Sequence, residues 1–140
     1  MNKKHQIIII ATFLLTLILV GGTALYLFFL NNARYNVYKT SNDEYKVKIC
    51  RIGNKLLPMG ESSAIIKIYD KEYHTYVADV EVYDIDNHGD EATADNFDVQ
   101  FMDEYIHIDI LDYNGEVDYT YRFYYDDLDE VAKGRKWKRK

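Results

Sequence analysis

The feature that most constrains this chain is an uninterrupted apolar stretch near its amino terminus. Residues 7–30 run for 24 positions with no ionisable side chain except that of Tyr26. A helix of this length measures roughly 36 Å at about 1.5 Å per residue, and the hydrocarbon core of a bilayer is about 30 Å thick. The stretch therefore predicts a transmembrane helix over 7–30.

The end of this stretch indicates an anchor that is retained. A secretory signal peptide has a shorter apolar region followed by small residues at a cleavage site. Here the stretch ends in Leu-Phe-Phe-Leu-Asn-Asn-Ala, and the single cysteine, Cys50, lies too far along the chain for lipid attachment beside it. We expect an uncleaved anchor that holds the protein in a cell membrane.

The numbers of basic residues on the two sides of the span do not establish its orientation in the membrane. Lys3 and Lys4 precede it, whereas Arg34, Lys39, Lys46 and Lys48 follow it. A short basic tail before a long apolar run is, however, the usual form of a signal anchor. We therefore expect residues 1–6 in the cytoplasm and the carboxyl-terminal domain outside it.

The remaining 110 residues suffice for one small domain, and their pattern favours β structure. The chain has 14 tyrosines and one proline, and apolar side chains alternate with polar ones in six short runs. These runs cover residues 45–52, 63–70, 73–86, 97–102, 105–111 and 117–125. They predict an all-β fold, an antiparallel β-sandwich-like domain over 45–130 between a linker (31–44) and a basic tail (131–140).

One hairpin can be placed in register from the sequence. Asn114-Gly115 is a strong signal for a two-residue type I′ turn. Pairing outward from it places Ile110, Ile108 and Ile106 opposite Tyr119, Tyr121 and Phe123 on one face. The other face pairs Leu111, Asp109 and His107 with Asp118, Thr120 and Arg122. The first face is apolar, and we expect it to belong to the core.

The charges are divided into blocks along the chain. Residues 31–71 carry eight basic and four acidic residues, residues 72–132 carry 19 acidic residues and one basic residue, and the last eight carry six basic residues. One interpretation is that the basic parts screen an acidic sheet. The other is that an acidic surface recruits cations or a basic partner, while the basic tail contacts anionic lipid or polymer. The acidic excess disfavours nucleic-acid binding.

Residues 83–98 carry six acidic residues around one glycine, and two interpretations remain open for this stretch. The spacing partly matches a calcium loop, with Asp84, Asp86, Asp90 and Asp95 as candidate metal ligands and Gly89 at the turn. His88 stands where a further oxygen ligand is needed, however, and the flanking residues read as strands. The alternative is a polar crossover loop whose aspartates are solvated.

Catalytic patterns are weak. His74, His88 and His107 lie in separate runs without metal-ligand spacing, and nothing near Cys50 would lower the pKa of its thiol. His107 and Asp109 share a face with Arg122, which we interpret as a cross-strand polar group. We therefore expect no enzymatic activity and, apart from calcium, no cofactor.

Two segments, "YKVKICRIGNKLLPMGESSAIIKIYD" and "NHGDEATADNFDVQFMDEYIHIDI", carry a resemblance. Their Arg-Ile-Gly, Pro-Met-Gly and Asn-x-Gly features, within residues 41–112, resemble small, largely uncharacterised bacterial proteins with a membrane or lipid anchor and one short β domain. This resemblance implies the fold class and a position outside the cytoplasm. It implies no active-site residues.

The sequence thus predicts a membrane-anchored binding or regulatory module that engages another envelope protein through an acidic face. Asp103, Glu104 and Asp109 are the residues expected to carry that face. The alternative is a calcium-dependent structural or adhesion domain that uses the acidic loop.

Overall fold

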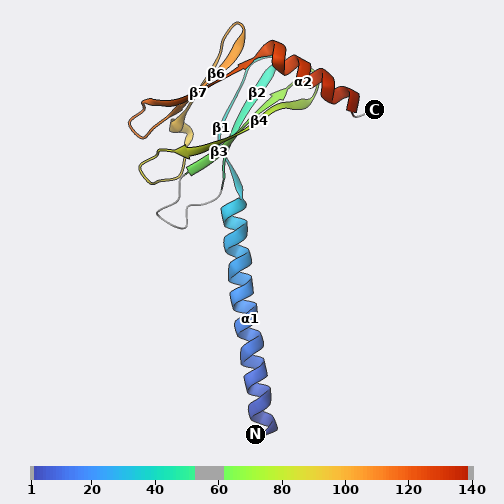
Figure 1. Ribbon diagram of the computed structural model, residues 1–140, viewed down its shortest axis with the longest axis vertical. Helices are drawn as coiled ribbons and strands as arrows, with labels where there is room; N and C mark the ends of the chain where they lie inside the picture. Colours follow the sequence, from blue (N-terminus) through green and yellow to red (C-terminus); the bar gives the residue numbers. More distant parts are fainter. Residues whose placement is uncertain (1, 53–61, 139–140) are drawn as a thin grey trace.

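The computed structural model describes residues 2–52 and 62–138, which form one long helix and a β domain at its carboxyl end (Figure 1). The helix is α1 (Lys3–Asn32). The strands are β1 (Arg34–Ser41), β2 (Tyr45–Ile52), β3 (Ser62–Asp70), β4 (Thr75–Ile85), β5 (Phe97–Phe101), β6 (Tyr105–Leu111) and β7 (Val117–Tyr124). A 3-10 turn, η1 (Ala94–Asn96), precedes β5, and a second helix, α2 (Tyr125–Lys138), ends the described chain.

Helix α1 contains a span, Lys3–Leu30, that is long and apolar enough to cross a membrane. None of that span is buried against the rest of the chain, and an amino-terminal signal sequence can also be long and apolar enough to meet this criterion. Its threonine hydroxyls donate to carbonyl oxygens one turn earlier, from Thr12 to Ile8 (2.9 Å), from Thr16 to Thr12 (2.9 Å) and from Thr23 to Leu19 (2.7 Å). These polar groups are therefore satisfied within the helix itself.

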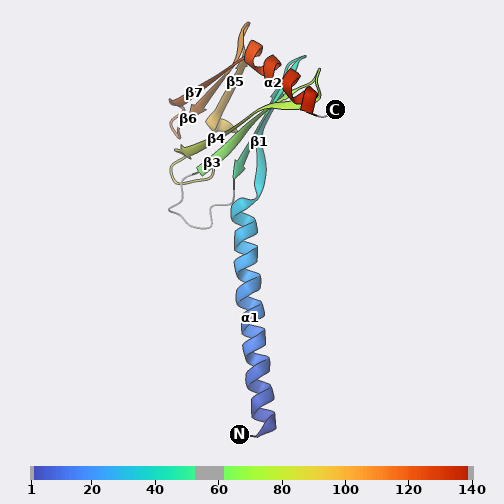
Figure 2. The same cartoon turned by 45° about the vertical axis from the view of Figure 1, so that its right-hand side comes forward.

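The β domain consists of two antiparallel sheets around a shared core. One sheet has the order β1-β2-β3-β4 and the other has the order β5-β6-β7. Figure 2 shows the three-stranded sheet on one side of the four-stranded sheet, with α2 at the end of the domain away from α1. The predicted antiparallel β domain that follows an apolar helix is confirmed.

Period-two alternation explains which side chains form this core. Val47 and Ile49 of β2, with Ile66 and Ile68 of β3, are fully buried on the inner face of the first sheet. Their counterparts on the second sheet are Ile106, Ile108 and Ile110 of β6. Because successive side chains of a strand point to opposite faces, the intervening residues face outward.

Two parts of the predicted organisation differ from the structure. The range expected to be a linker (31–44) contains β1, which pairs with β2 from Arg34 onward, after the single residue Ala33. The description as all-β is also inexact, because α2 covers 125–138 and buries Leu128 and Ala132 in the shared core. The last two residues of the predicted tail and the loop between β2 and β3, residues 53–61, lie outside the described residues.

The β6–β7 hairpin has the predicted pairing away from its turn, but the turn itself is not the predicted type I′ turn. Ile110, Ile108 and Ile106 pair with Tyr119, Tyr121 and Phe123 as expected. Near the turn, however, Leu111 pairs with Val117 instead of Asp118, and a register shift follows. Gly115 has a φ of +81°, whereas Asn114 does not have the positive φ that a type I′ turn requires.

The side chain of Asp112 stabilises this wider turn. Its Oδ1 accepts hydrogen bonds from the backbone N–H groups of Asn114 and Glu116, both at 2.8 Å. The register shift adds one residue to the β7 side, and this restores the predicted pairing beyond the turn. The expected core position of Tyr119 is wrong, because its side chain is 43% exposed on the edge strand.

Candidate binding surfaces

The acidic stretch 83–98 is the crossover between the two sheets. It leaves β4, turns at Gly89, whose φ is +82°, and enters β5 through η1. Asp84 lies near the end of β4 with a φ of +60°, and Asp95 lies in η1. The four predicted ligands, Asp84, Asp86, Asp90 and Asp95, are all exposed.

Buried polar groups hold this crossover in place. Asn96 is only 2% exposed, and its Nδ2 donates to the carbonyl oxygen of Leu111 in β6 (3.0 Å). Its Oδ1 accepts from the backbone N–H of Thr93 (2.9 Å). The hydroxyl of Ser62 in β3 accepts from the backbone N–H of Ala92 (2.8 Å). The crossover is therefore tied to both sheets by neutral side chains.

The structure does not bring the four aspartates together. Within residues 2–52 and 62–138, no three histidine, cysteine, aspartate or glutamate side chains converge as metal ligands would. The carboxylate of Asp86 accepts from the backbone N–H of His88 (3.3 Å), which is a turn contact. The geometry therefore supports the crossover interpretation, and calcium binding stays a prediction.

A polar cluster lies on the outer face of the three-stranded sheet. Asp109 accepts a hydrogen bond from the hydroxyl of Thr120 on Oδ1 (2.6 Å), and its Oδ2 lies 3.1 Å from Nε2 of His107. The Thr120 hydrogen bond, together with His107 and Arg122, holds the pKa of the Asp109 carboxyl below its ordinary value. The guanidinium of Arg122 lies over the ring of Tyr105, 5.6 Å from its centroid.

This cluster is not arranged for nucleophilic catalysis. The Thr120 hydroxyl donates its hydrogen to the carboxylate, and His107 contacts the other oxygen of the same carboxylate. In a catalytic triad the histidine lies between the nucleophile and the carboxylate, because it must accept the proton. The cross-strand polar group predicted from the sequence is present, and its geometry fits a stabilising role.

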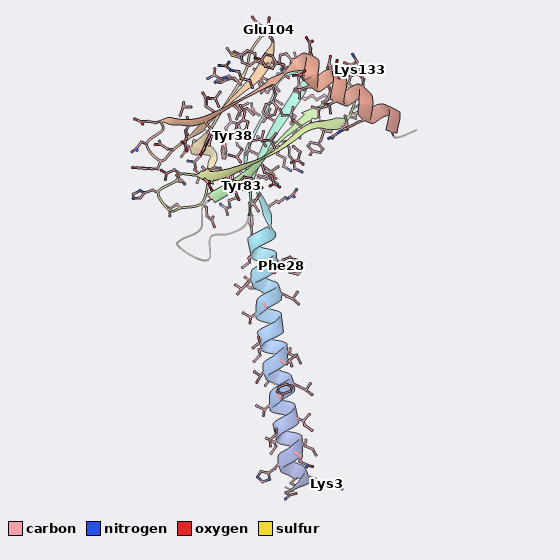
Figure 3. The ribbon with its side chains drawn as sticks, viewed as in Figure 1. Lys3, Phe28, Tyr38, Tyr83, Glu104 and Lys133 are labelled. Atoms are coloured by element: carbon pink, nitrogen blue, oxygen red, sulfur yellow. The ribbon has the colours of Figure 1, made fainter. Side chains whose placement is uncertain are left out.

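A second acidic group forms at the end of the domain farthest from α1, and we call it the distal acidic pole. It is made by the β1–β2 turn, the β5–β6 turn and the first turn of α2. Its exposed residues are Asp43, Glu44, Asp103, Glu104, Asp126 and Asp127. Figure 3 shows Glu104 at the tip of the domain, opposite the end to which α1 connects. Asp109, which was expected on the same face, lies instead in the polar cluster.

Two stacked tyrosines join the three segments of the distal acidic pole. The rings of Tyr45 and Tyr125 lie 5.2 Å apart with an interplanar angle of 15°. The backbone N–H of Tyr125 donates to the carbonyl oxygen of Glu104 (3.1 Å), and its hydroxyl donates to the carbonyl oxygen of Met102 (2.9 Å). Burial, with the charges of Glu44 and Asp103, raises the pKa of Tyr125. The carboxylates of two separate turns therefore lie close to one ring.

A group of lysines lies on the outer face of β1, β2 and β3 in the four-stranded sheet, and we call it the lysine face. It consists of Lys39, Lys46, Lys48 and Lys67. These residues alternate along β1, β2 and β3 with the core residues of the same strands, so they point away from the core. The sequence showed the alternation in β2, but it did not show that β1 is a strand or that the lysines of three strands align.

The chain has no significant match among protein-family models, curated proteins or solved structures. The resemblance to small anchored bacterial proteins therefore stays an expectation.

Proposed function

We propose that this protein is a membrane-anchored binding module whose β domain lies outside the cytoplasm and engages a basic surface of another envelope protein. The observation that carries the proposal is the distal acidic pole. Three separate segments place six exposed carboxylates at the end of the domain farthest from α1. That end would be the first to meet a partner that approaches from the envelope.

The junction between α1 and β1 supports a retained anchor. Only Ala33 separates the two elements, and β1 is paired with β2 from its first residue, Arg34. A cleavable signal peptide has small residues at a cleavage site directly after its apolar region, whereas residues 27–33 read Leu-Phe-Phe-Leu-Asn-Asn-Ala at this junction. The helix continues to Asn32 and passes into the paired strand without a linker.

The orientation of the anchor can be tested directly. We expect a carboxyl-terminal epitope to be removed by protease added to cells whose outer layers have been opened but whose cytoplasmic membrane is intact. Lys3 and Lys4, which lie directly before the apolar span, support this orientation. Protection of the epitope until the membrane is lysed would reverse the topology and contradict an envelope partner.

The polar cluster favours binding over catalysis. Its carboxylate is occupied by Thr120 and His107, so neither side chain is poised to activate the other. The distal acidic pole, in contrast, has carboxylates that are exposed to solvent. Exposed charge of one sign steers and orients a partner of the opposite sign more than it sets the affinity.

Crosslinking in intact cells tests the proposed partner. The test variant neutralises four carboxylates of the distal acidic pole: Asp43→Asn, Glu44→Gln, Asp103→Asn and Glu104→Gln. The matched control neutralises the four exposed aspartates of the crossover: Asp84→Asn, Asp86→Asn, Asp90→Asn and Asp95→Asn. Both change the net charge equally, so a general electrostatic effect would appear in both.

We expect the crosslinked species to fall about tenfold in the pole variant, which corresponds to about 1.4 kcal/mol of binding free energy. It should be nearly unchanged in the control variant and should weaken as salt is raised. Equal yields in the two variants, or no crosslinked species above background at low salt, would contradict the proposal.

The calcium-dependent alternative is tested by a thermal melt of the full chain in neutral detergent. A ligand that binds the folded state raises the melting temperature by mass action. Because the four aspartates do not converge, we expect no rise in millimolar calcium. A rise that is lost on the combined change Asp84→Asn and Asp86→Asn would instead support the calcium-dependent domain.

A further inference from the structure

The lysine face contains a row of like charges that the strand register aligns. Lys39 of β1 pairs directly with Lys48 of β2, and Lys48 pairs directly with Lys67 of β3. Neighbouring strands lie about 4.8 Å apart, so three ammonium groups project from backbone positions spread over roughly 10 Å. Like charges placed directly opposite each other destabilise a sheet. The row therefore opposes folding.

The remaining lysine adds to the same repulsion. Lys46 lies one outward-facing position from Lys48 on β2 and diagonally across from Lys39. The positive charge of Lys39 is the largest cause that lowers the pKa of Lys46, and Lys48 acts in the same direction. Three ammonium groups thus lie close enough to affect one another.

A counter-charge stands at one end of this row. Lys67 lies 3.6 Å from the carboxylate of Asp79 in β4. Among the residues that the structure describes, Lys39, Lys46 and Lys48 take part in no ion pair. The chain carries 23 acidic residues, yet within the described ranges none of them pairs with these three lysines.

The basic carboxyl-terminal half of α2 begins beside this surface. The Nζ of Lys67 lies over the ring of Tyr76, 5.5 Å from its centroid. The guanidinium of Arg135 in α2 donates to the backbone carbonyl oxygen of the same tyrosine. The outer face of β4 itself carries Asp79 and Glu81, opposite Lys67 and Ile65 of β3, so acidic residues bound the lysine face on this side.

We propose that the lysine face binds a flexible linear polyanion that carries a phosphate charge at each repeat. Lysine presents a compact ammonium on a flexible stem and binds phosphate as a point charge, whereas paired recognition of a carboxylate favours arginine. A row of such charges across neighbouring strands suits a linear polymer with repeated charges. This inference is independent of the acidic pole and of its protein partner.

The position of the row disfavours lipid headgroups as the ligand. Lys39 lies five residues after Arg34, where β1 leaves α1, which is roughly 16 Å along the strand. The Debye length at physiological salt is about 8 Å. A lipid surface at the end of α1 would therefore be largely screened from the lysines, whereas a polymer that extends through the surrounding layer would reach them.

The test uses the full chain in neutral detergent and linear polyphosphate as the probe. The test variant is Lys46→Gln with Lys48→Gln, and the matched control is Lys3→Gln with Lys4→Gln, which removes the same charge at the amino terminus. Inorganic phosphate and vesicles of phosphatidylglycerol are titrated in parallel. Binding is measured at several salt concentrations.

We expect polyphosphate to bind the test variant at least about tenfold more weakly than the unchanged protein, with less than a twofold change in the control. The slope of log affinity against log salt should fall by roughly 0.7 for each phosphate that the variant no longer neutralises. The melting temperature of the test variant should be equal to or above that of the unchanged protein, because repulsion within the sheet is relieved. This thermal result separates weaker binding from misfolding.

Three results would overturn the proposal. The first is equal polyphosphate affinity in the test and control variants. The second is an affinity for inorganic phosphate that matches that for polyphosphate, because a polymer site gains affinity from several contacts on one chain. The third is binding to phosphatidylglycerol vesicles without binding to polyphosphate, which would assign the lysine face to a lipid surface.

Discussion

Asn96 should be the residue on which the crossover between the two sheets most depends. Its side chain is 2% exposed and joins η1 to β6 through the carbonyl oxygen of Leu111 (3.0 Å), while it also accepts from the backbone N–H of Thr93 (2.9 Å). A third, longer contact of 3.4 Å reaches Oδ1 of Asn87. Asn96→Ala removes these three hydrogen bonds and leaves the carbonyl of Leu111 without this partner.

The expected loss of stability follows from these hydrogen bonds. Each of the two shorter ones contributes about 1 kcal/mol, and a buried group left without a partner adds about 1–3 kcal/mol. We therefore expect Asn96→Ala to lower the free energy of unfolding by about 3–5 kcal/mol. For a domain of this size the melting temperature should fall by roughly 12–25 °C.

The assay is equilibrium unfolding of the full chain in neutral detergent, followed through the tyrosine signals of the β domain. The control is Asp95→Ala, which changes an exposed neighbour in the same turn and should cost less than about 0.5 kcal/mol. A loss below about 1 kcal/mol for Asn96→Ala, or an equal loss in both variants, would refute the reasoning.

A charged replacement gives a second measurement at the same position. Asn96→Asp keeps an acceptor for the backbone N–H of Thr93, but it places a carboxylate beside the carbonyl oxygen of Leu111. Burial and this oxygen should raise the pKa of the new carboxyl in the folded state. A raised pKa gives stability at low pH that is lost as pH rises, so the defect should grow from acidic to neutral pH. A defect that does not change with pH would contradict this geometry.

Three further predictions concern the β domain. The pKa of Asp109 is lowered in the folded state chiefly by its hydrogen bond from Thr120, so Thr120→Val should cost about 1 kcal/mol of stability at neutral pH. The stability difference between this variant and the unchanged protein should vanish as pH falls through the folded pKa of Asp109. Denaturant unfolding at a series of pH values measures this difference. Tyr45→Phe should cost about 1–2 kcal/mol in the same assay at pH 7, because the buried hydroxyl donates to Oδ1 of Asp129 (3.0 Å), and an unchanged unfolding midpoint would contradict this assignment. Gly115→Ala should lower stability by about 1 kcal/mol because its φ is +81°, whereas a residue that accepts this conformation, as in Gly115→Asn, should cost less.

The parts of the fold that were predicted are those in which local pattern and tertiary position agree. In β6, Ile106, Ile108 and Ile110 alternate with polar residues, and all three are fully buried. The register of the hairpin also followed from its sequence beyond the turn. The turn itself did not, because the side chain of Asp112 stabilises a wider loop and a register shift compensates for it.

Two elements were missed because their own residues bury little surface. Strand β1 has no fully buried residue, and its pattern of partly exposed side chains resembles a linker. Helix α2 buries only Leu128 and Ala132 among its described side chains, and these lie four residues apart among many charged residues. In both cases the neighbouring elements decide the structure, and a single sequence does not show them.

The candidate surfaces were predictable only in part, for a related reason. Asp103 and Glu104 were expected on an acidic face, and they do lie on the distal acidic pole. Asp43 and Glu44 belong to the distal acidic pole only because β1 is a strand, which places the β1–β2 turn at that end of the domain. The lysine face likewise requires the register of three strands, and charge counts along the chain cannot supply it.

The single residue between α1 and β1 has a geometric consequence for the whole domain. Each residue of an α-helix turns the chain by about 100° and advances it by about 1.5 Å. Because only Ala33 lies at the junction, the direction in which the β domain faces around the axis of α1 depends on the number of residues in that helix. One residue inserted into α1 would turn both charged surfaces by about 100° relative to any neighbour that packs on the helix. Seven inserted residues would return them to within about 20° of their original direction, at greater height.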